Sequence, residues 1–304
     1  MRKLTRTGLA LTGVVLAVVS GGCGTGEAGG GTTGAGTVAL DRALHDALPQ
    51  EIRDSGVIRL ATDPSYAPME SYGTDGRTVI GFDPDLAAAL GAVLGVKVEM
   101  VPADFDTALG EAKNGAYDGV LSAMTDTAER EKKADFINYF AAGTSIVVQR
   151  GNPRGVIDLK DLCGQVVAVE KGTIQVDLLQ RSQPGCGARP ITIRTYKTNS
   201  DAVLQLRTGR AVASLTDYPP AVHLTTDART RAYFQLASTV QYEPGLYGLA
   251  VPKGRTGLRD SLRDALDRLI RSGAYAELLE RWGLGSGALT ASSINAGGGE
   301  SGTD

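Results

Sequence analysis

Residues 118–136 read DGVLSAMTDTAEREKKADF, and this stretch predicts both a fold class and a first candidate binding residue. The apolar run 119–124 has the length of a buried strand. A Thr-Asp-Thr triplet follows at 125–127, and these residue types favour helix N-caps. The pattern therefore predicts a strand that ends where a helix begins.

Arg130 falls in the first turn of that predicted helix. The start of a helix presents unpaired N–H groups and the positive end of the helix dipole, so it attracts an anion. A guanidinium at this point can donate two bonds to a carboxylate, and the Thr125 hydroxyl can add a third. The alternative is an ordinary solvated arginine within the charged run 129–133.

Length and composition indicate a globular protein. The chain has 304 residues, of which 42% are hydrophobic and 21% are charged, so it can form two domains or one large one, with a substantial core. Its formal net charge of −3 provides no basic surface for nucleic acid.

The N-terminus has the pattern of an export signal. A basic start precedes the apolar run 9–19, which is short for a membrane span. Residues 1–22 resemble a bacterial lipoprotein signal, whose removal would leave Cys23 lipidated. Ser20 departs from the aliphatic residue that is usual three positions before such a cysteine, and a plain secretory signal is the alternative. Both readings place the protein outside the cytoplasm.

Both ends of the chain are rich in small residues. Segment 23–43 is expected to be a lipidated cysteine followed by a flexible tether, and residues 284–304 are expected to be a disordered tail. The remaining cysteines, Cys163 and Cys186, are expected to form a disulfide worth about 3 kcal/mol in an exported protein. No metal site is expected, because the two histidines show no ligand spacing with these cysteines.

From residue 57 onward, short apolar runs alternate with helical stretches. Strands are predicted at 57–61, 78–82, 96–101, 119–124, 145–149, 166–169, 191–196, 211–215 and 247–251. Helices are predicted at 83–94, 105–114, from 173, at 200–208 and within 258–282. This order predicts an α/β fold with a largely parallel sheet, whose ligand-binding loops lie at the carboxyl ends of the strands.

Two of those loops carry groups of opposite charge. If the loops face each other across a cleft, Arg130, Thr125 and the backbone amides near Thr173 would hold a carboxylate. Asp217, at the end of strand 211–215, would accept bonds from an ammonium group. Together these groups describe a receptor for the head group of an α-amino acid. The alternative for Asp217 is a turn residue before two prolines.

Tyr66 and Phe105 are candidates for the walls of such a site. Their rings can offer flat apolar surfaces, or a cation–π face if the ligand side chain is charged. Ordinary core packing is the alternative for both.

These features resemble the bacterial extracellular solute-binding proteins of family 3, the polar amino-acid receptors of ABC transporters. The resemblance covers residues 44–282. It is carried by the opening stretch and by ATDPSYAPMES, GFDPDLAAAL, VAVEKGTIQ, LQLRTGR and SGAYAELLERWG. It implies a type II periplasmic-binding-protein fold, in which two α/β lobes are joined by two crossover strands. The first lobe is expected at 44–142 with 241–283, and the second at 143–240.

The resemblance also assigns roles to individual positions. The residues implied to hold the ligand carboxylate are Arg130, Thr125, Thr173 and Ile174. Asp217 is implied to hold the ligand ammonium. The residues implied to line the side-chain pocket are Asp63, Tyr66, Phe105, Ser122 and Gln175. No catalytic residue, cofactor or metal is implied. The chain departs from the family at Met69, where Phe is common, and at Val212, where Asp is usual.

The expected function is capture of a free amino acid between the two lobes and its delivery to an ABC permease in the membrane. The receptor is expected to be a monomer, anchored to the outer face of the cytoplasmic membrane if Cys23 is lipidated. A basic or polar ligand is favoured, because the Asp63 carboxylate and two aromatic faces all attract a cation. Glutamine remains open as a ligand, and Asp63 capping a turn is the alternative for that residue.

Two rival functions are open. One is a sensory receptor that regulates a partner protein. The other is a dehydratase-like enzyme on the same scaffold, with Asp63 or Glu70 as general acid. Because no nucleophile–base pair or metal set accompanies those carboxyls, the expectation is a binding protein and not an enzyme.

Overall fold

The computed structural model describes residues 38–297. The expected signal peptide at 1–22, the candidate lipidation site Cys23 and the tether as far as residue 37 lie outside the described residues. Within 38–297, none of the helices has the length and apolar character that crossing a membrane requires.

Helix α1 (Arg42–Ala47) begins before residue 44, so the expected end of the tether at residue 43 is too late. Helix α1 (Arg42–Ala47) starts at Asp41, whose carboxylate accepts bonds from two backbone N–H groups of the first turn. The Asp41 N–H donates to the Val93 carbonyl at 2.8 Å, which fixes this segment to helix α3 (Phe82–Leu94). The cap is a local side-chain bond that composition alone does not reveal.

The first lobe is built on three parallel strands. Strand β1 (Val57–Thr62) lies between β5 (Lys97–Pro102) and β6 (Gly119–Val120). Leu60 belongs to a core shared with α3, whereas its neighbour Ala61 belongs to a core on the opposite face. Because both faces are covered there, consecutive residues of the strand are apolar at this point, whereas Arg59 just before them is exposed.

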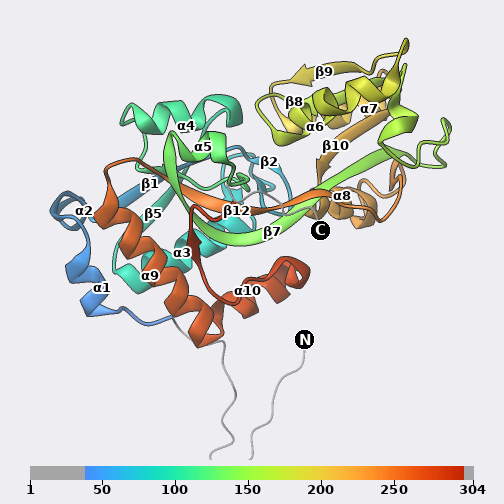
Figure 1. The fold of residues 1–304 in the computed structure, drawn as a ribbon. Helices are drawn as coiled ribbons and strands as arrows, with labels where there is room; N and C mark the ends of the chain where they lie inside the picture. Colours follow the sequence, from blue (N-terminus) through green and yellow to red (C-terminus); the bar gives the residue numbers. More distant parts are fainter. Residues whose placement is uncertain (1–37, 298–304) are drawn as a thin grey trace, which may run out of the picture. The chain divides into compact units, whose positions relative to one another are not determined.

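Helices and one small antiparallel sheet complete this lobe (Figure 1). The helices are α2 (Gln50–Ser55), α4 (Phe105–Lys113), α5 (Ala128–Glu131), α9 (Thr256–Ser272) and α10 (Ala274–Trp282). The small sheet consists of β2 (Ser65–Tyr66), β3 (Glu70–Tyr72) and β4 (Val79–Ile80).

The second lobe repeats the α/β arrangement with parallel strands of its own. Strand β8 (Val166–Glu170) pairs with β9 (Thr192–Tyr196) and with β10 (Ala213–Asp217). The surrounding elements are η1 (Leu159–Leu162), α6 (Ile174–Ser182), η2 (Gln183–Cys186), α7 (Asn199–Arg207), α8 (Tyr218–Thr226) and β11 (Phe234–Leu236). The expected disulfide is confirmed: Cys163 and Cys186 are bonded, and they join η1 to η2.

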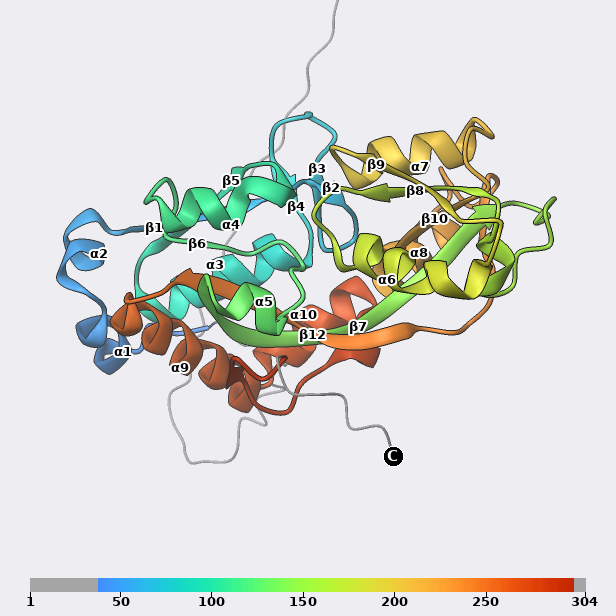
Figure 2. The ribbon, with the colours of Figure 1, turned by 45° about the horizontal axis from the view of Figure 1, so that its top comes forward.

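Two long strands connect the lobes. Strand β7 (Ala134–Gln149) pairs with β12 (Tyr242–Pro252) along most of its length and with β10 at its end. In Figure 2 both strands run from the region of α3 and α9 toward that of α6 and α8. The predicted fold class, two α/β lobes joined by two crossover strands, is confirmed. The predicted strand 145–149 is only the apolar end of β7, because an Ala-Ala-Gly-Thr run at 141–144 hides the continuity.

Strand β6 is shorter than predicted. Residues 121–124 are buried but leave the sheet, and Ala123 has a positive φ of 45°. The carboxylate of Asp83 accepts the Ala123 N–H at 2.9 Å, which stabilises this conformation. The chain is thereby turned toward the one-turn helix α5.

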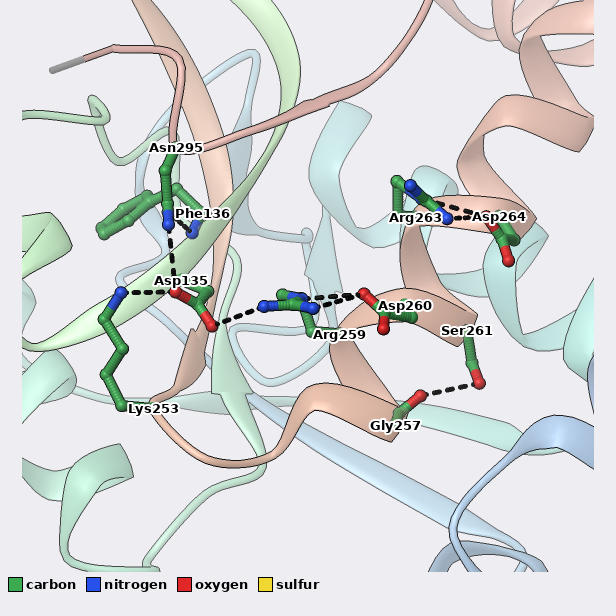
Figure 3. A network of polar contacts seen from close by, with 10 residues as sticks. All are labelled: Asp135, Phe136, Lys253, Gly257, Arg259, Asp260, Ser261, Arg263, Asp264 and Asn295. Atoms are coloured by element: carbon green, nitrogen blue, oxygen red, sulfur yellow. Dashed lines mark hydrogen bonds and ion pairs between the residues drawn. The ribbon is translucent and has the colours of Figure 1, made fainter.

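The expectation of disorder after Trp282 is wrong for residues 284–297. Helix η3 (Gly285–Gly287) and strand β13 (Ser293–Ile294) follow α10, and β13 pairs with β7 beside Asn138 and Ile137. The Asn295 side chain anchors the segment, because it accepts the Phe136 N–H at 2.8 Å and donates to Asp135 at 3.0 Å (Figure 3). Such partners lie far along the chain and are not visible in a Gly-rich composition.

Candidate functional site

Arg130 lies between the lobes. It belongs to α5, whose N-cap Thr127 accepts the Arg130 N–H at 3.3 Å, as the threonines of this stretch predict. Its guanidinium donates to the Thr125 carbonyl at 2.7 Å and to the Gly172 carbonyl of the second lobe at 3.0 Å. The Arg130 Cζ atom is 5.5 Å from the centre of the Phe105 ring. Burial lowers the pKa of Arg130 to about 10, so the side chain remains cationic at neutral pH.

Asp217 of the second lobe faces the same space between the lobes as Arg130. It ends β10, and its carboxylate accepts bonds from the Gln175 amide at 2.6 Å and from the Tyr66 hydroxyl at 3.0 Å. Burial raises the pKa of Asp217 to about 6, against the opposing effects of neighbouring hydroxyls and of Arg130. The two groups expected to hold an amino-acid head group therefore face one cavity.

The other end of the cavity is acidic. The Ser122 hydroxyl accepts the Asp63 N–H at 2.9 Å and donates to the Glu70 carboxyl at 2.9 Å. Glu170 enters from the end of β8 and contacts Asp63. Burial is the main cause that raises the pKa of Asp63, and it raises the pKa of Glu70 and of Glu170 well above the ordinary range.

Glu70 also contacts a second buried carboxyl, Asp83 of α3. Burial raises the pKa of Asp83 to about 6, while the Ala123 N–H and the Tyr139 hydroxyl stabilise its charged form. Asp83 does not line the cavity, but it accepts the Ala123 N–H and lies against Glu70, and both of these residues line it.

All ten residues expected to contact the ligand line this single cavity. Its space free of atoms is about 310 Å³, with the solvent at its mouth included. The ten are Asp63, Tyr66, Phe105, Ser122, Thr125, Arg130, Thr173, Ile174, Gln175 and Asp217. The resemblance implied that Gln175 lines the side-chain pocket with Asp63 and Ser122. Its amide instead donates to Asp217, the residue expected to hold the ligand ammonium.

Three further residues line the cavity, namely Glu70, Ala123 and Glu170. Glu70 entered the sequence analysis only as a possible general acid of a rival enzyme. Glu170 was missed, although an acidic residue directly after the apolar run 166–169 was a usable signal. Ala123 carries no polar side chain that could have drawn notice.

The lobes touch beside the cavity, at the start of α4. Lys171 pairs with Asp106 at 2.6 Å, and Lys197 pairs with Asp104 at 3.0 Å. Gly172 has a positive φ of 78°, and a Cβ placed on it would lie 2.6 Å from the Asp106 Cβ. Glycine is thus required twice here, for the turn and for the close approach of the lobes.

The cavity shows no sign of a metal centre. Among residues 38–297, no group of three or more His, Cys, Asp or Glu side chains is placed to hold a metal ion. The cavity instead combines one guanidinium with carboxylates and aromatic walls, an arrangement that suits a small zwitterionic or cationic guest.

Fold and site together define a two-lobed solute-binding protein of the type II periplasmic class. Residues 58–285 match the family described as bacterial extracellular solute-binding proteins, family 3, and the chain belongs to this family.

Relatives and solved structures agree with this assignment. The arginine-binding protein ArgT of Corynebacterium glutamicum is 29% identical over 252 residues, which cover 82% of this chain and 81% of the relative. An ancestral arginine-binding protein bound to arginine is 32% identical, covers 75% of this chain and 98% of its own, and superposes with a TM-score of 0.69. The ancestral amino acid-binding protein AncCDT-1, a precursor of cyclohexadienyl dehydratase, is 33% identical, covers 76% and 97%, and has a TM-score of 0.68.

Proposed function

We propose that this protein captures a free cationic amino acid and presents it to an ABC permease. The observation that carries the proposal is the charge pattern of the cavity, in which Arg130 faces four carboxyl residues. Arg130 and Asp217 match the carboxylate and ammonium of an amino acid. Asp63, Glu70 and Glu170 then remain at the other end, where a guanidinium or ammonium side chain would be neutralised. The relatives named for arginine support this choice.

Each lining residue takes a role in this proposal. Arg130 binds the ligand carboxylate together with the Thr125 hydroxyl and the amides of Thr173 and Ile174. Asp217 receives the ammonium group and is held in place by Gln175. The Phe105 ring, already below the guanidinium of Arg130, forms one wall of the pocket, and Tyr66 forms the opposite one.

Capture is proposed to work by closure of the lobes. Arg130 belongs to the first lobe, which is formed by residues 44–142 and 241–283. Asp217 belongs to the second lobe, at 143–240. A ligand that bridges these residues therefore favours the closed arrangement, and it shifts the equilibrium by its differential affinity for the two states. The closed form is what a permease would recognise. Lipidation of Cys23 would keep a monomeric receptor near that permease.

The central experiment compares ligands and one variant. Protein freed of bound ligand is titrated with L-arginine, L-lysine, L-glutamine and L-cystine by calorimetry, and its melting temperature is recorded with each. We expect arginine and lysine to bind and to raise the melting temperature. Arg130→Ala should weaken binding by about 100-fold, because it leaves a buried carboxylate unpaired. The exposed Arg154→Ala is the matched control.

Three outcomes separate the parts of the proposal. Binding of glutamine or cystine with no binding of arginine or lysine would show that the cationic preference is wrong. The absence of binding by any amino acid would refute capture itself. Recovery of the bound amino acid chemically altered would support the rival enzyme, because the proposal holds that the ligand leaves the cavity unchanged.

A further inference from the structure

Asp63 and Glu170 bring two carboxyl groups into contact across the cavity. Asp63 follows β1 in the first lobe, Glu170 ends β8 in the second, and their side chains are within hydrogen-bonding reach. The residues are only 6% and 5% exposed, and both line the cavity. Among residues 38–297, the Glu170 Oε1 atom has no hydrogen-bond partner.

Such a contact requires a proton. Two ionised carboxylates in contact repel each other and, away from water, lose their solvation, so one of them holds a proton that the other accepts. Burial is the largest cause of the raised pKa of both residues, and the Asp63 carboxyl raises the pKa of Glu170 further.

The charged and titratable surroundings reinforce this state. The groups that act on the pair are Asp104 and Asp106 at the start of α4, Glu70 on β3, Tyr66 on β2, Asp217 on β10 and Lys197 before α7. Lys197 is the cation of this set, and Asp104 holds it in an ion pair. The surroundings are therefore mainly acidic and favour the bound proton.

Building on the proposed function, we propose that Glu170 determines the specificity of the receptor. Without ligand, Glu170 shares one proton with Asp63, and the cationic group of the ligand side chain replaces this proton on binding. The balance is simple. Before binding, the pair carries one proton and one negative charge. The guanidinium or ammonium brings one positive charge, the proton leaves to solvent, and the cavity keeps the same net charge.

This exchange explains how the pair discriminates between ligands. A neutral side chain of the same shape cannot neutralise the negative charge of two ionised carboxylates. The shared proton therefore stays on the pair, and binding gains no electrostatic stabilisation from it. A cationic side chain that bridges both carboxylates also joins the two lobes, because each carboxylate belongs to a different lobe. Selectivity and closure therefore depend on one pair of residues.

The test compares L-arginine with L-citrulline, which has the same length but a neutral urea group. Calorimetry in two buffers of different ionisation enthalpy gives the number of protons released on binding. Both ligands have the same head group, so release from Asp217 is common to both and cancels in the difference. We expect arginine to release up to about one proton more than citrulline, and its affinity relative to citrulline to rise by up to about ten-fold per pH unit over the pH range in which the ligand-free pair holds its proton.

Glu170→Gln separates this role from a structural one. Glutamine keeps a donor for Asp63 but has no proton to release, and the contact between Glu70 and Asp83 is untouched. We expect the extra release with arginine to disappear and the preference for arginine over citrulline to fall by about ten-fold. Glu99→Gln, at an exposed strand position paired with Lys97, is the control that should change neither.

Equal proton release for the two ligands across this pH range would overturn the inference. So would a Glu170→Gln protein that keeps the full preference for arginine. In both cases amino acids still bind, and the proposed function stands. The absence of binding by any amino acid would instead count against the proposed function itself.

Discussion

The hydroxyl of Tyr66 bonds twice to Asp217 across the two lobes. It donates to the Asp217 carboxylate at 3.0 Å and accepts the Asp217 N–H at 2.9 Å, and both residues are buried. Tyr66 lies on β2 of the first lobe, whereas Asp217 ends β10 of the second. A residue expected only as an aromatic wall therefore also fixes the carboxylate proposed to receive the ligand ammonium.

Tyr66→Phe should keep the aromatic wall of the pocket and lose both hydrogen bonds between the Tyr66 hydroxyl and Asp217. A hydrogen bond to a charged group contributes about 1.5–3 kcal/mol, so we expect ligand affinity to fall by about ten-fold or more. Calorimetric titration with L-arginine measures the change. Tyr72→Phe, at a residue that is 47% exposed, should leave the affinity unchanged. Equal affinities for the Tyr66 variant and the parent protein would mean that the hydroxyl does not support the site.

Ionisation of Asp217 should make the ligand-free protein less stable as the pH rises. Its pKa of about 6 in the folded state is above the value of 3.8 expected for the unfolded chain. A raised folded-state pKa stabilises the protein at low pH, and this contribution is lost as the pH rises through about 6.

Chemical denaturation of the parent protein and of Asp217→Asn, at several pH values, measures this effect. We expect the free energy of unfolding of the parent, relative to the variant, to fall by up to about 3 kcal/mol from about pH 4 to above pH 6. A difference that stays constant across this range would show that Asp217 does not titrate as described.

The two ion pairs beside the cavity should favour closure weakly. Lys171–Asp106 and Lys197–Asp104 join the lobes, but both lysines are exposed, so solvent screens them. Changing both lysines to Met should reduce ligand affinity by about two- to five-fold and reduce its dependence on salt. Lys97→Met removes a pair that lies within one strand and should have no effect. Unchanged affinity and salt dependence in the double variant would exclude a role in closure.

The C-terminal segment should contribute to stability. Asn295→Ala removes its bonds to the Phe136 N–H and to Asp135, and leaves a buried donor without a partner. We expect a loss of about 1–3 kcal/mol in the free energy of unfolding. Asn114→Ala, at an exposed position after α4, is the control. A variant as stable as the parent would indicate that the Asn295 side chain adds nothing to stability.

Much of the fold and of the site follows from local sequence. The run 166–169, and the run 57–61 with its one exposed Arg59, place strands in both lobes, because a strand covered on both faces is mainly apolar. Threonines at the start of α5 predict its capping, since a hydroxyl satisfies a free N–H within three residues. Arg130, Asp217 and the aromatic residues stand at strand or helix ends, where parallel sheets bind ligands.

Only the tertiary structure decided the features that depend on contacts between distant segments. The docking of Asn295, the second role of Tyr66, the position of Gln175 and the contact of Glu170 with Asp63 each join residues far apart in the sequence. A sequence pattern reports which groups a segment must bury, because burial acts on each residue where it stands. It does not report which distant group will meet a polar atom, because that depends on how the lobes and the two crossover strands place their ends in space.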